Sequence, residues 1–155
     1  MSEEILLRDY SPCTDFDEVV AVTREIISDS SDDARQELAA YPGRRLTAKV
    51  AVDHTGTLIG FCASTHPYWD NVAMIDYLVV APGARGRGVG TQLVTAIEAE
   101  LREFGIGQVC VQTASWNDDG IRFYERLGYS RLAVFPEYLG KGNDAVWLNR
   151  SLSSG

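Results

Sequence analysis

A nearly continuous apolar run occupies residues 74–80 and is followed by a glycine-rich turn. Apolar side chains on both alternating faces are typical of a strand buried within a sheet. Pro82 and Gly83 predict the end of this strand, because proline cannot donate a hydrogen bond to a sheet ladder. Beyond the turn, apolar residues at spacings of three and four predict a helix over residues 89–104. The remaining elements are arranged around this strand, turn and helix.

The pattern before this unit predicts a strand, two helices and a hairpin. These are expected at residues 5–10, about 14–27, about 32–41, 47–52 and 58–64. Thr14 or Asp15 is suited to cap the first helix, and Pro42 ends the second. Residues 65–71 are polar and aromatic, which predicts a loop between the hairpin and the central strand.

The pattern after the unit predicts a strand, a short helix and two more strands. These are expected at residues 108–114, 118–127, 129–135 and 145–150. The complete order predicts an α/β fold with a mixed sheet and helices on both faces. We expect a single domain over residues 1–150, followed by a tail over residues 151–155.

The turn between the central strand and its helix is suited to bind an anion. Backbone N–H groups at a helix start lack intrahelical partners, and the helix dipole adds partial positive charge. Glycines allow close approach of a ligand, and Arg85 and Arg87 add fixed charge. A phosphate or pyrophosphate fits such a site. The alternative is a tight turn with two solvated arginines.

Two common phosphate-binding motifs do not match this turn. A Walker P-loop needs Gly-Lys-Ser/Thr, and the dinucleotide fingerprint G-x-G-x-x-G fails at Thr91. Arg85, Gly88 and Gly90 instead give R-x-x-G-x-G, which resembles the acetyl-CoA signature of the GNAT superfamily of N-acetyltransferases. In that family the turn holds the pyrophosphate of coenzyme A.

A second block resembles the same family. Asn117 is followed by Phe123-Tyr124, three residues, Gly128 and Tyr129, as in the second conserved GNAT block. The resemblance implies that Asn117 binds the pantetheine arm and that Tyr124 lies near the sulfur as a general acid. From the residues alone, Asn117 also suits a helix N-cap and Tyr124 a core position.

The resemblance covers roughly residues 73–132 and implies a central, twisted, mostly antiparallel sheet with helices on both faces. It also implies acetyl-CoA as cosubstrate. The residues expected to hold it are Leu78, Val79, Val80, Arg85, Gly86, Arg87, Gly88, Val89, Gly90, Thr91, Asn117 and Tyr124. The N–H of Val79 or Val80 is expected to bind the thioester oxygen, and the sequence leaves that choice open.

Asp76 is the favoured candidate for the base that deprotonates the acceptor amine. It is the only charged residue in residues 72–80, so burial is expected to raise its pKa. The alternative is a buried aspartate that bonds to backbone or a neighbouring tyrosine. Glu137 and a water relay are further candidates for the base.

Composition narrows the possible partners and chemistry. The net charge of −8 arises within residues 1–40, which argues against nucleic acid and is compatible with a cationic amine acceptor or with a solvated acidic surface. Cys62 and Cys110 occur in apolar strands and are predicted to be buried hydrophobes of a reducing compartment. With two histidines far from any cysteine pair, no metal site is expected.

We therefore expect a cytoplasmic N-acetyltransferase that moves an acetyl group from acetyl-CoA to a primary amine by direct attack. No apolar run of membrane-spanning length and no signal-peptide layout is present, so no membrane partner is expected. Many family members dimerise, so the resemblance allows a homodimer. The alternative function is a non-catalytic acyl-CoA-binding or regulatory module on the same fold. Antibiotic modification is one form that the catalytic function could take.

Overall fold

The computed structural model describes residues 4–26 and 45–152. These residues form one seven-stranded sheet in the order β1-β2-β3-β4-β5-β7-β6. The strands are β1 (Leu6–Asp9), β2 (Arg45–Val52), β3 (Leu58–Trp69), β4 (Val72–Val80), β5 (Gln108–Ala114), β6 (Ser130–Phe135) and β7 (Ala145–Ser151). The helices are α1 (Pro12–Ile26), α3 (Val89–Glu103), α4 (Asp118–Arg126) and the short 3-10 turn η1 (Pro82–Ala84). The predicted helix at about residues 32–41 lies outside the described residues.

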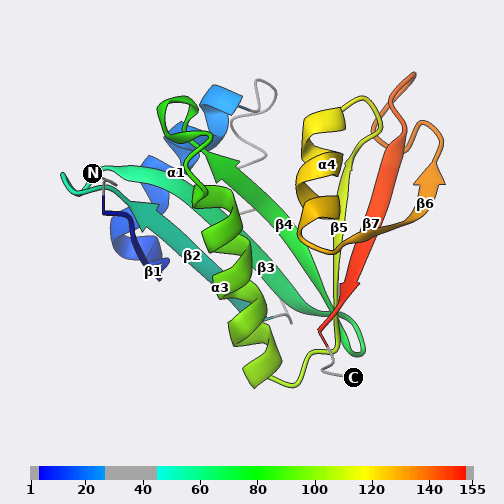
Figure 1. Ribbon diagram of the computed structural model, residues 1–155, viewed down its shortest axis with the longest axis horizontal. Coiled ribbons are helices and arrows are strands. Elements are labelled where there is room, and N and C mark those ends of the chain that lie inside the picture. The colour runs from blue at the N-terminus through cyan, green and yellow to red at the C-terminus, as the bar shows by residue number, and fades with distance from the viewer. Residues whose placement is uncertain (1–3, 27–44, 153–155) are drawn as a thin grey trace.

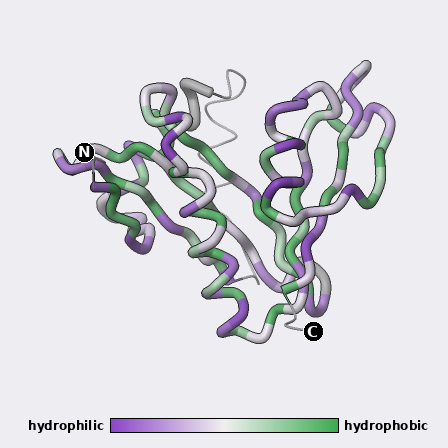
Figure 2. The backbone as a smooth tube through the Cα atoms, viewed as in Figure 1, coloured by the Kyte–Doolittle hydropathy of each residue, from purple (hydrophilic) through white to green (hydrophobic). Residues whose placement is uncertain are grey.

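Helices cover both faces of this sheet (Figure 1). Helix α3 packs its apolar stripe on one face, and Leu93, Val94, Ile97 and Leu101 are fully buried there together with residues of α4. Helix α1 packs on the opposite face in a second, smaller core. Figure 2 shows the central strands largely in the hydrophobic colour. The expected architecture, a mixed sheet with helices on both faces, is confirmed.

Strand directions also agree with the expectation of a mostly antiparallel sheet. Every neighbouring pair is antiparallel except β4 and β5, which are parallel. Helix α3 makes the crossover that a parallel pair requires. None of the helices in the described part of the chain has the length and apolarity that a bilayer crossing requires.

The predicted loop over residues 65–71 is wrong for most of its length. Strand β3 continues to Trp69, pairing Thr65 with Met74 of β4 and His66 with Arg45 of β2. Thr65 and His66 are buried, although their polarity favours a loop. Thr65 pairs with both neighbouring strands and His66 pairs with β2, and this backbone pairing overrides the polarity of the two side chains.

Helix α1 begins earlier than predicted, at Pro12, which occupies a first-turn position that proline favours. Asp15 does not cap the helix from outside. Its carboxylate accepts a hydrogen bond from the N–H of Ser11 at 2.8 Å and two from the guanidinium of Arg8, each at 2.8 Å. These hydrogen bonds hold the pKa of the buried Asp15 below its ordinary value, although desolvation opposes them. The carboxylate therefore ties α1 to β1.

Replacing Asp15 with asparagine should lower the free energy of unfolding by about 2 kcal/mol at neutral pH, because a buried charged acceptor loses its charge. The folded pKa is depressed, so this stability is fully present above the ordinary carboxyl pKa of about 3.9 and is lost as the pH falls through the lower folded value. Urea unfolding at neutral and acidic pH measures both effects. The control D119N alters an exposed pair with Arg122 and should change stability by less than about 0.5 kcal/mol. Equal losses in the two variants would contradict the assignment.

Candidate active site

Strands β4 and β5 pair over only part of their length. Their ladder runs from Val72 opposite Gln108 to Ile75 opposite Val111. Beyond it β4 pairs with β3 and β5 pairs with β7, so the two strands diverge (Figure 1). A gap opens beside the carboxyl end of β4, where the sequence predicts the donor site.

The alternation of the β3–β4 ladder decides which backbone groups of β4 face this gap. The N–H of Ala81 donates to the carbonyl of Ile59 at 2.9 Å, and Val80 and Val79 continue the same register. Hydrogen-bonded and non-hydrogen-bonded pairs alternate along an antiparallel ladder. Val79 is therefore bonded to β3, whereas the N–H and C=O groups of Leu78 and Val80 point towards the gap. Of the two donors expected from the sequence, this favours Val80 over Val79, and it adds Leu78.

Two glycines shape the turn between β4 and α3. Gly86 and Gly88 have φ angles of 78° and 77°, in the left-handed region that other residues rarely adopt. Gly88 directly precedes α3, and no side chain caps that helix end. The N–H groups of the first turn of α3 thus remain available to a ligand, and the helix dipole favours an anion there. This is the backbone geometry of a phosphate site.

A cavity of about 640 Å³ lies between this turn, the end of β4 and α4. Its lining residues are Leu78, Val79, Val80, Ala84, Arg85, Gly86, Gly88, Val89, Gly90, Thr91, Asn117, Asp119, Gly120, Phe123 and Arg126. All the residues expected to hold acetyl-CoA line the cavity except Arg87 and Tyr124. The structure thus brings the two sequence blocks together across a single opening.

Helix α4 forms one wall of this cavity, which was not predicted from the sequence. Gly120, Phe123 and Arg126 follow Asn117 at successive spacings of three, which places all four on one side of the helix. That spacing was visible in the sequence and could have identified them. A Cβ atom on Gly90 would lie only 3.2 Å from the ring of Phe123, so this glycine allows α3 to start close to α4. Arg126 adds a positive charge to the opening.

Asn117 occupies the N-cap of α4. Its Oδ1 accepts a hydrogen bond from the N–H of Gly120 at 3.1 Å, and its Nδ2 donates to the hydroxyl of Thr113 at 2.9 Å. The Asn117 side chain therefore caps α4, which is one of the two roles that the sequence allows. Because Asn117 also lines the cavity, capping fixes the position of a group that faces the donor site.

Tyr124 lies behind the cavity wall and is 6% exposed. Its ring packs edge-on against Phe123 and Tyr129, with centroid distances of 5.0 and 5.3 Å. Burial raises the pKa of Tyr124 well above its ordinary value, so the phenol stays protonated at physiological pH. A buried, protonated phenol is suited to donate a hydrogen bond to a developing anion.

Cys62 and Cys110 are both buried, as predicted. Burial, and then the negative charges of Asp76 and Glu98, raise the pKa of the Cys62 thiol well above its ordinary value. The thiolate is the nucleophilic form of cysteine, and these surroundings disfavour it. The Cys62 site therefore favours direct transfer over a cysteine-bound intermediate.

Asp76 occupies a β-bulge in β4. The β3–β4 register shifts between Ala63 opposite Tyr77 and Ser64 opposite Ile75, so Asp76 is the extra residue. Its Oδ2 accepts a hydrogen bond from the hydroxyl of Thr65 at 2.8 Å. The bulge turns a half-buried carboxylate out of the regular ladder, close to where β4 and β5 separate.

The other candidate base, Glu137, lies in the loop between β6 and β7. It is exposed and has a φ of 54°, and its Oε1 accepts a hydrogen bond from the N–H of Gly142 at 3.2 Å. Asp144 accepts a hydrogen bond from the N–H of Glu137 at 2.9 Å. These contacts show that Glu137 organises its own loop. Neither Glu137 nor Asp76 is among the residues that line the cavity, so the two candidates differ in their place in the fold, on β4 and on an exposed loop.

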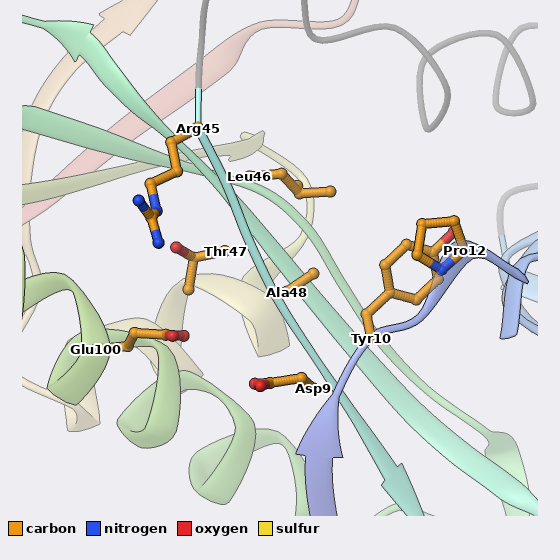
Figure 3. Close-up of a pocket in the computed structure, with 8 residues that line it drawn as sticks. All are labelled: Asp9, Tyr10, Pro12, Arg45, Leu46, Thr47, Ala48 and Glu100. Carbon is orange, nitrogen blue, oxygen red and sulfur yellow. The ribbon is translucent and has the colours of Figure 1, made fainter. Parts of the chain in front are cut away.

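A smaller hollow of about 190 Å³ lies at the start of β2. Figure 3 shows Arg45, Thr47, Asp9 and Glu100 on one side of this strand. Lys49 of β2 pairs with both carboxylates, and the distance to Glu100 is 3.2 Å. Desolvation opposes its charge, but the hydrogen bonds to Asp9 and Glu100 raise the pKa of Lys49 overall. These charges join β1, β2 and α3, so the hollow is explained by packing between elements.

Comparisons with known proteins agree with this geometry. The model of the acetyltransferase (GNAT) family matches residues 6–129. Streptothricin acetyltransferase of Streptomyces lavendulae is 35% identical over 104 residues, which cover 64% of this chain and 55% of that protein. Mycothiol acetyltransferase of Actinosynnema mirum is 29% identical over 145 residues, covering 89% of this chain and 48% of the relative. The chain thus spans about half the length of the curated relatives it matches.

The solved structures share the fold over nearly the whole chain. An aminoglycoside 6'-N-acetyltransferase complexed with coenzyme A superposes with a TM-score of 0.81 at 22% identity, covering 97% of this chain and 98% of that one. At this identity the similarity establishes the fold alone. The chain therefore shares its overall fold with that solved structure.

Proposed function

Since the chain belongs to the acetyltransferase (GNAT) family, we propose that it transfers an acetyl group from acetyl-CoA to a primary amine. The observation that carries this proposal is the cavity at the diverging strands, where the uncapped start of α3 meets the free edge of β4. A ligand with a charged pyrophosphate and an extended amide arm would use both features at once. Acetyl-CoA has both parts.

The residues around the cavity fit such a donor. The N–H groups at the start of α3, after Gly88, would hold the pyrophosphate, and Arg85 and Arg126 would add charge. The gap-facing backbone groups of Val80 would pair with the pantetheine amides as an added strand does. The N–H of Leu78 or Val80 would then face the thioester oxygen. The volume of about 640 Å³ is within the range of small-molecule sites.

Bound acetyl-CoA supplies an activated acyl group with a thiolate leaving group. The chain must then remove a proton from the amine, stabilise the oxygen that gains charge and stabilise the departing sulfur. Asp76 is the proposed base, with Glu137 or a relayed water as alternatives. A backbone N–H of β4 would stabilise the oxygen. The buried phenol of Tyr124 would act as the general acid: it would hydrogen-bond the departing sulfur and give it a proton.

For the acceptor, we propose a cationic primary amine. Phe135, Tyr138 and Trp147 form a cluster beside the β6–β7 loop, with ring centroids 5.6 to 6.4 Å apart. Phe135 and Tyr138 are 42% and 58% exposed, and we propose that their rings interact with the cation. The acidic residues Asp29, Asp32 and Asp33 could also attract an amine, and they lie outside the described residues.

Replacing Tyr124 with phenylalanine should lower kcat by about tenfold or more while the affinity for acetyl-CoA is unchanged. The phenol is proposed to act on the sulfur only as the bond breaks, so its loss affects the transition state and not donor binding. Steady-state kinetics combined with calorimetric titration of acetyl-CoA separate the two effects. Normal turnover in Y124F would remove Tyr124 from the mechanism.

Isothermal titration with acetyl-CoA, with adenosine monophosphate as comparison, tests the donor site. We expect binding of acetyl-CoA with a Kd on the order of micromolar and much weaker binding of the monophosphate, because the pyrophosphate and the amide arm contribute most contacts. Undetectable binding of acetyl-CoA would overturn the proposal and leave the glycine turn with a purely structural role.

A further inference from the structure

A series of buried contacts links Glu98 of α3 to Tyr124. Glu98 of α3 is 2% exposed, and its Oε1 accepts a hydrogen bond from the guanidinium of Arg150 at 2.9 Å. Its Oε2 accepts one from the hydroxyl of Tyr129, also at 2.9 Å. The ring of Tyr129 in turn packs edge-on against Tyr124, with centroids 5.3 Å apart. These contacts thus join α3, β7 and the segment after α4.

This arrangement needs an explanation beyond stability. A buried carboxylate must be fully hydrogen-bonded to be tolerated, and an apolar residue of similar volume is often as stable. Here the carboxylate accepts a hydrogen bond from the hydroxyl of Tyr129, and the ring of Tyr129 makes an edge contact with that of Tyr124. The N–H of Tyr129 also donates to the carbonyl of Tyr124 at 3.0 Å, so the two residues are held together at both backbone and ring.

We propose that Tyr129 is a positioning residue for the acetyl transfer: anchored by Glu98 and Arg150, it holds the phenol of Tyr124 in the orientation that meets the leaving sulfur. The inference rests on the proposed function of Tyr124. Tyr129 does not itself line the donor cavity, so it acts through the neighbouring ring. Burial and the adjacent Glu98 charge raise the pKa of Tyr129 well above its ordinary value, so its hydroxyl remains a donor to Glu98.

A double-mutant cycle tests this assignment. Y129F keeps the ring but removes the hydroxyl that Glu98 anchors. We expect kcat to fall by about three- to tenfold, with KM and calorimetric Kd for acetyl-CoA unchanged. In a Y124F background, the same Y129F change should lower kcat by less than about 1.5-fold, because the group it positions is already absent. Y10F is the matched control on the opposite side of the sheet, where Tyr10 packs on Phe61, and should leave kcat unchanged.

Nuclear magnetic resonance of protein carrying isotope-labelled tyrosine gives a readout that does not depend on activity. In Y129F without any ligand, the ring resonance of Tyr124 should shift or broaden, whereas Y10F should leave it in place. Thermal unfolding checks that each variant is folded, and E98Q provides a second way to weaken the anchor without altering either ring.

The outcomes separate the inference from the function on which it rests. A slow Y124F with a normal Y129F overturns the positioning role alone. An equal loss from Y129F in both backgrounds also overturns it, because the effect then bypasses Tyr124. Normal turnover in Y124F itself removes the proposed acid, and the positioning role with it. Non-additive losses together with the altered Tyr124 resonance support the inference.

Discussion

Replacing Gly88 with aspartate should raise the Kd for acetyl-CoA by at least about 100-fold. Gly88 has a φ of 77° and directly precedes the uncapped start of α3. An L-residue in this conformation costs roughly 1–2 kcal/mol, and a carboxylate here would compete with the pyrophosphate for the same N–H groups. Calorimetric titration of acetyl-CoA into the variant measures the loss.

Gly105 provides the matched control for this variant. It has a φ of 78° just beyond the opposite end of α3, and a Cβ atom there would meet nothing within 4 Å. G105D therefore introduces a similar backbone strain and the same charge away from the cavity, and should bind acetyl-CoA as the parent does. If G105D and G88D lose affinity equally, the effect arises from destabilisation of α3, and the anion site at its start is contradicted.

Replacing Asp76 with asparagine should lower kcat/KM by about 100-fold or more at low pH, with a smaller deficit as the pH rises. The direction follows from the chemistry of the acceptor. An amine is mostly protonated at low pH and depends on a base, whereas at high pH a growing fraction is already unprotonated. The asparagine can still accept the hydrogen bond from Thr65. The bulge should therefore persist, and the pH–rate profile of kcat/KM isolates the loss of the base.

The variant E137Q distinguishes Glu137 from Asp76 as the general base. If Asp76 is the base, E137Q should keep the parental pH profile, with at most a modest change in KM from its altered loop. An unchanged pH–rate profile in D76N would assign Asp76 a structural role in the bulge. A loss that appears only in E137Q would transfer the role of base to Glu137.

The sequence predicted the central unit of the fold well, because its signals are local and strong. Strand β4 (Val72–Val80), the glycine turn and helix α3 follow from apolar periodicity and from residues that only a turn accepts. Strand β5 was predicted with the bounds that the structure has, Gln108–Ala114. The GNAT resemblance added the expected sheet and the two blocks that meet at the cavity.

The errors arose where a non-local contact outweighs a local signal. Residues 65–69 are polar and aromatic yet extend β3, because β2 pairs with Thr65 and His66 and β4 pairs with Thr65 and Trp69. Whether the N–H of Val79 or that of Val80 faces the gap depends on how β4 pairs with β3, and the sequence of β4 alone does not determine that pairing. Arg126 and Phe123 are the exception, because they share one face of α4 with Asn117 at a local spacing of three that the sequence does contain. The Glu98–Tyr129 contact joins positions 31 residues apart and has no sequence pattern.

The most direct test of the central claim mixes the purified chain with acetyl-CoA and a panel of primary amines that includes polyamines, aminoglycosides and peptide N-termini. Thiol release and the mass of each amine are measured in the same sample. We predict that at least one amine gains an acetyl group, with one thiol released per product and with the reaction slowed in D76N. Tight binding of acetyl-CoA without any acetylated amine or released thiol would contradict catalysis and favour a non-catalytic acyl-CoA-binding module.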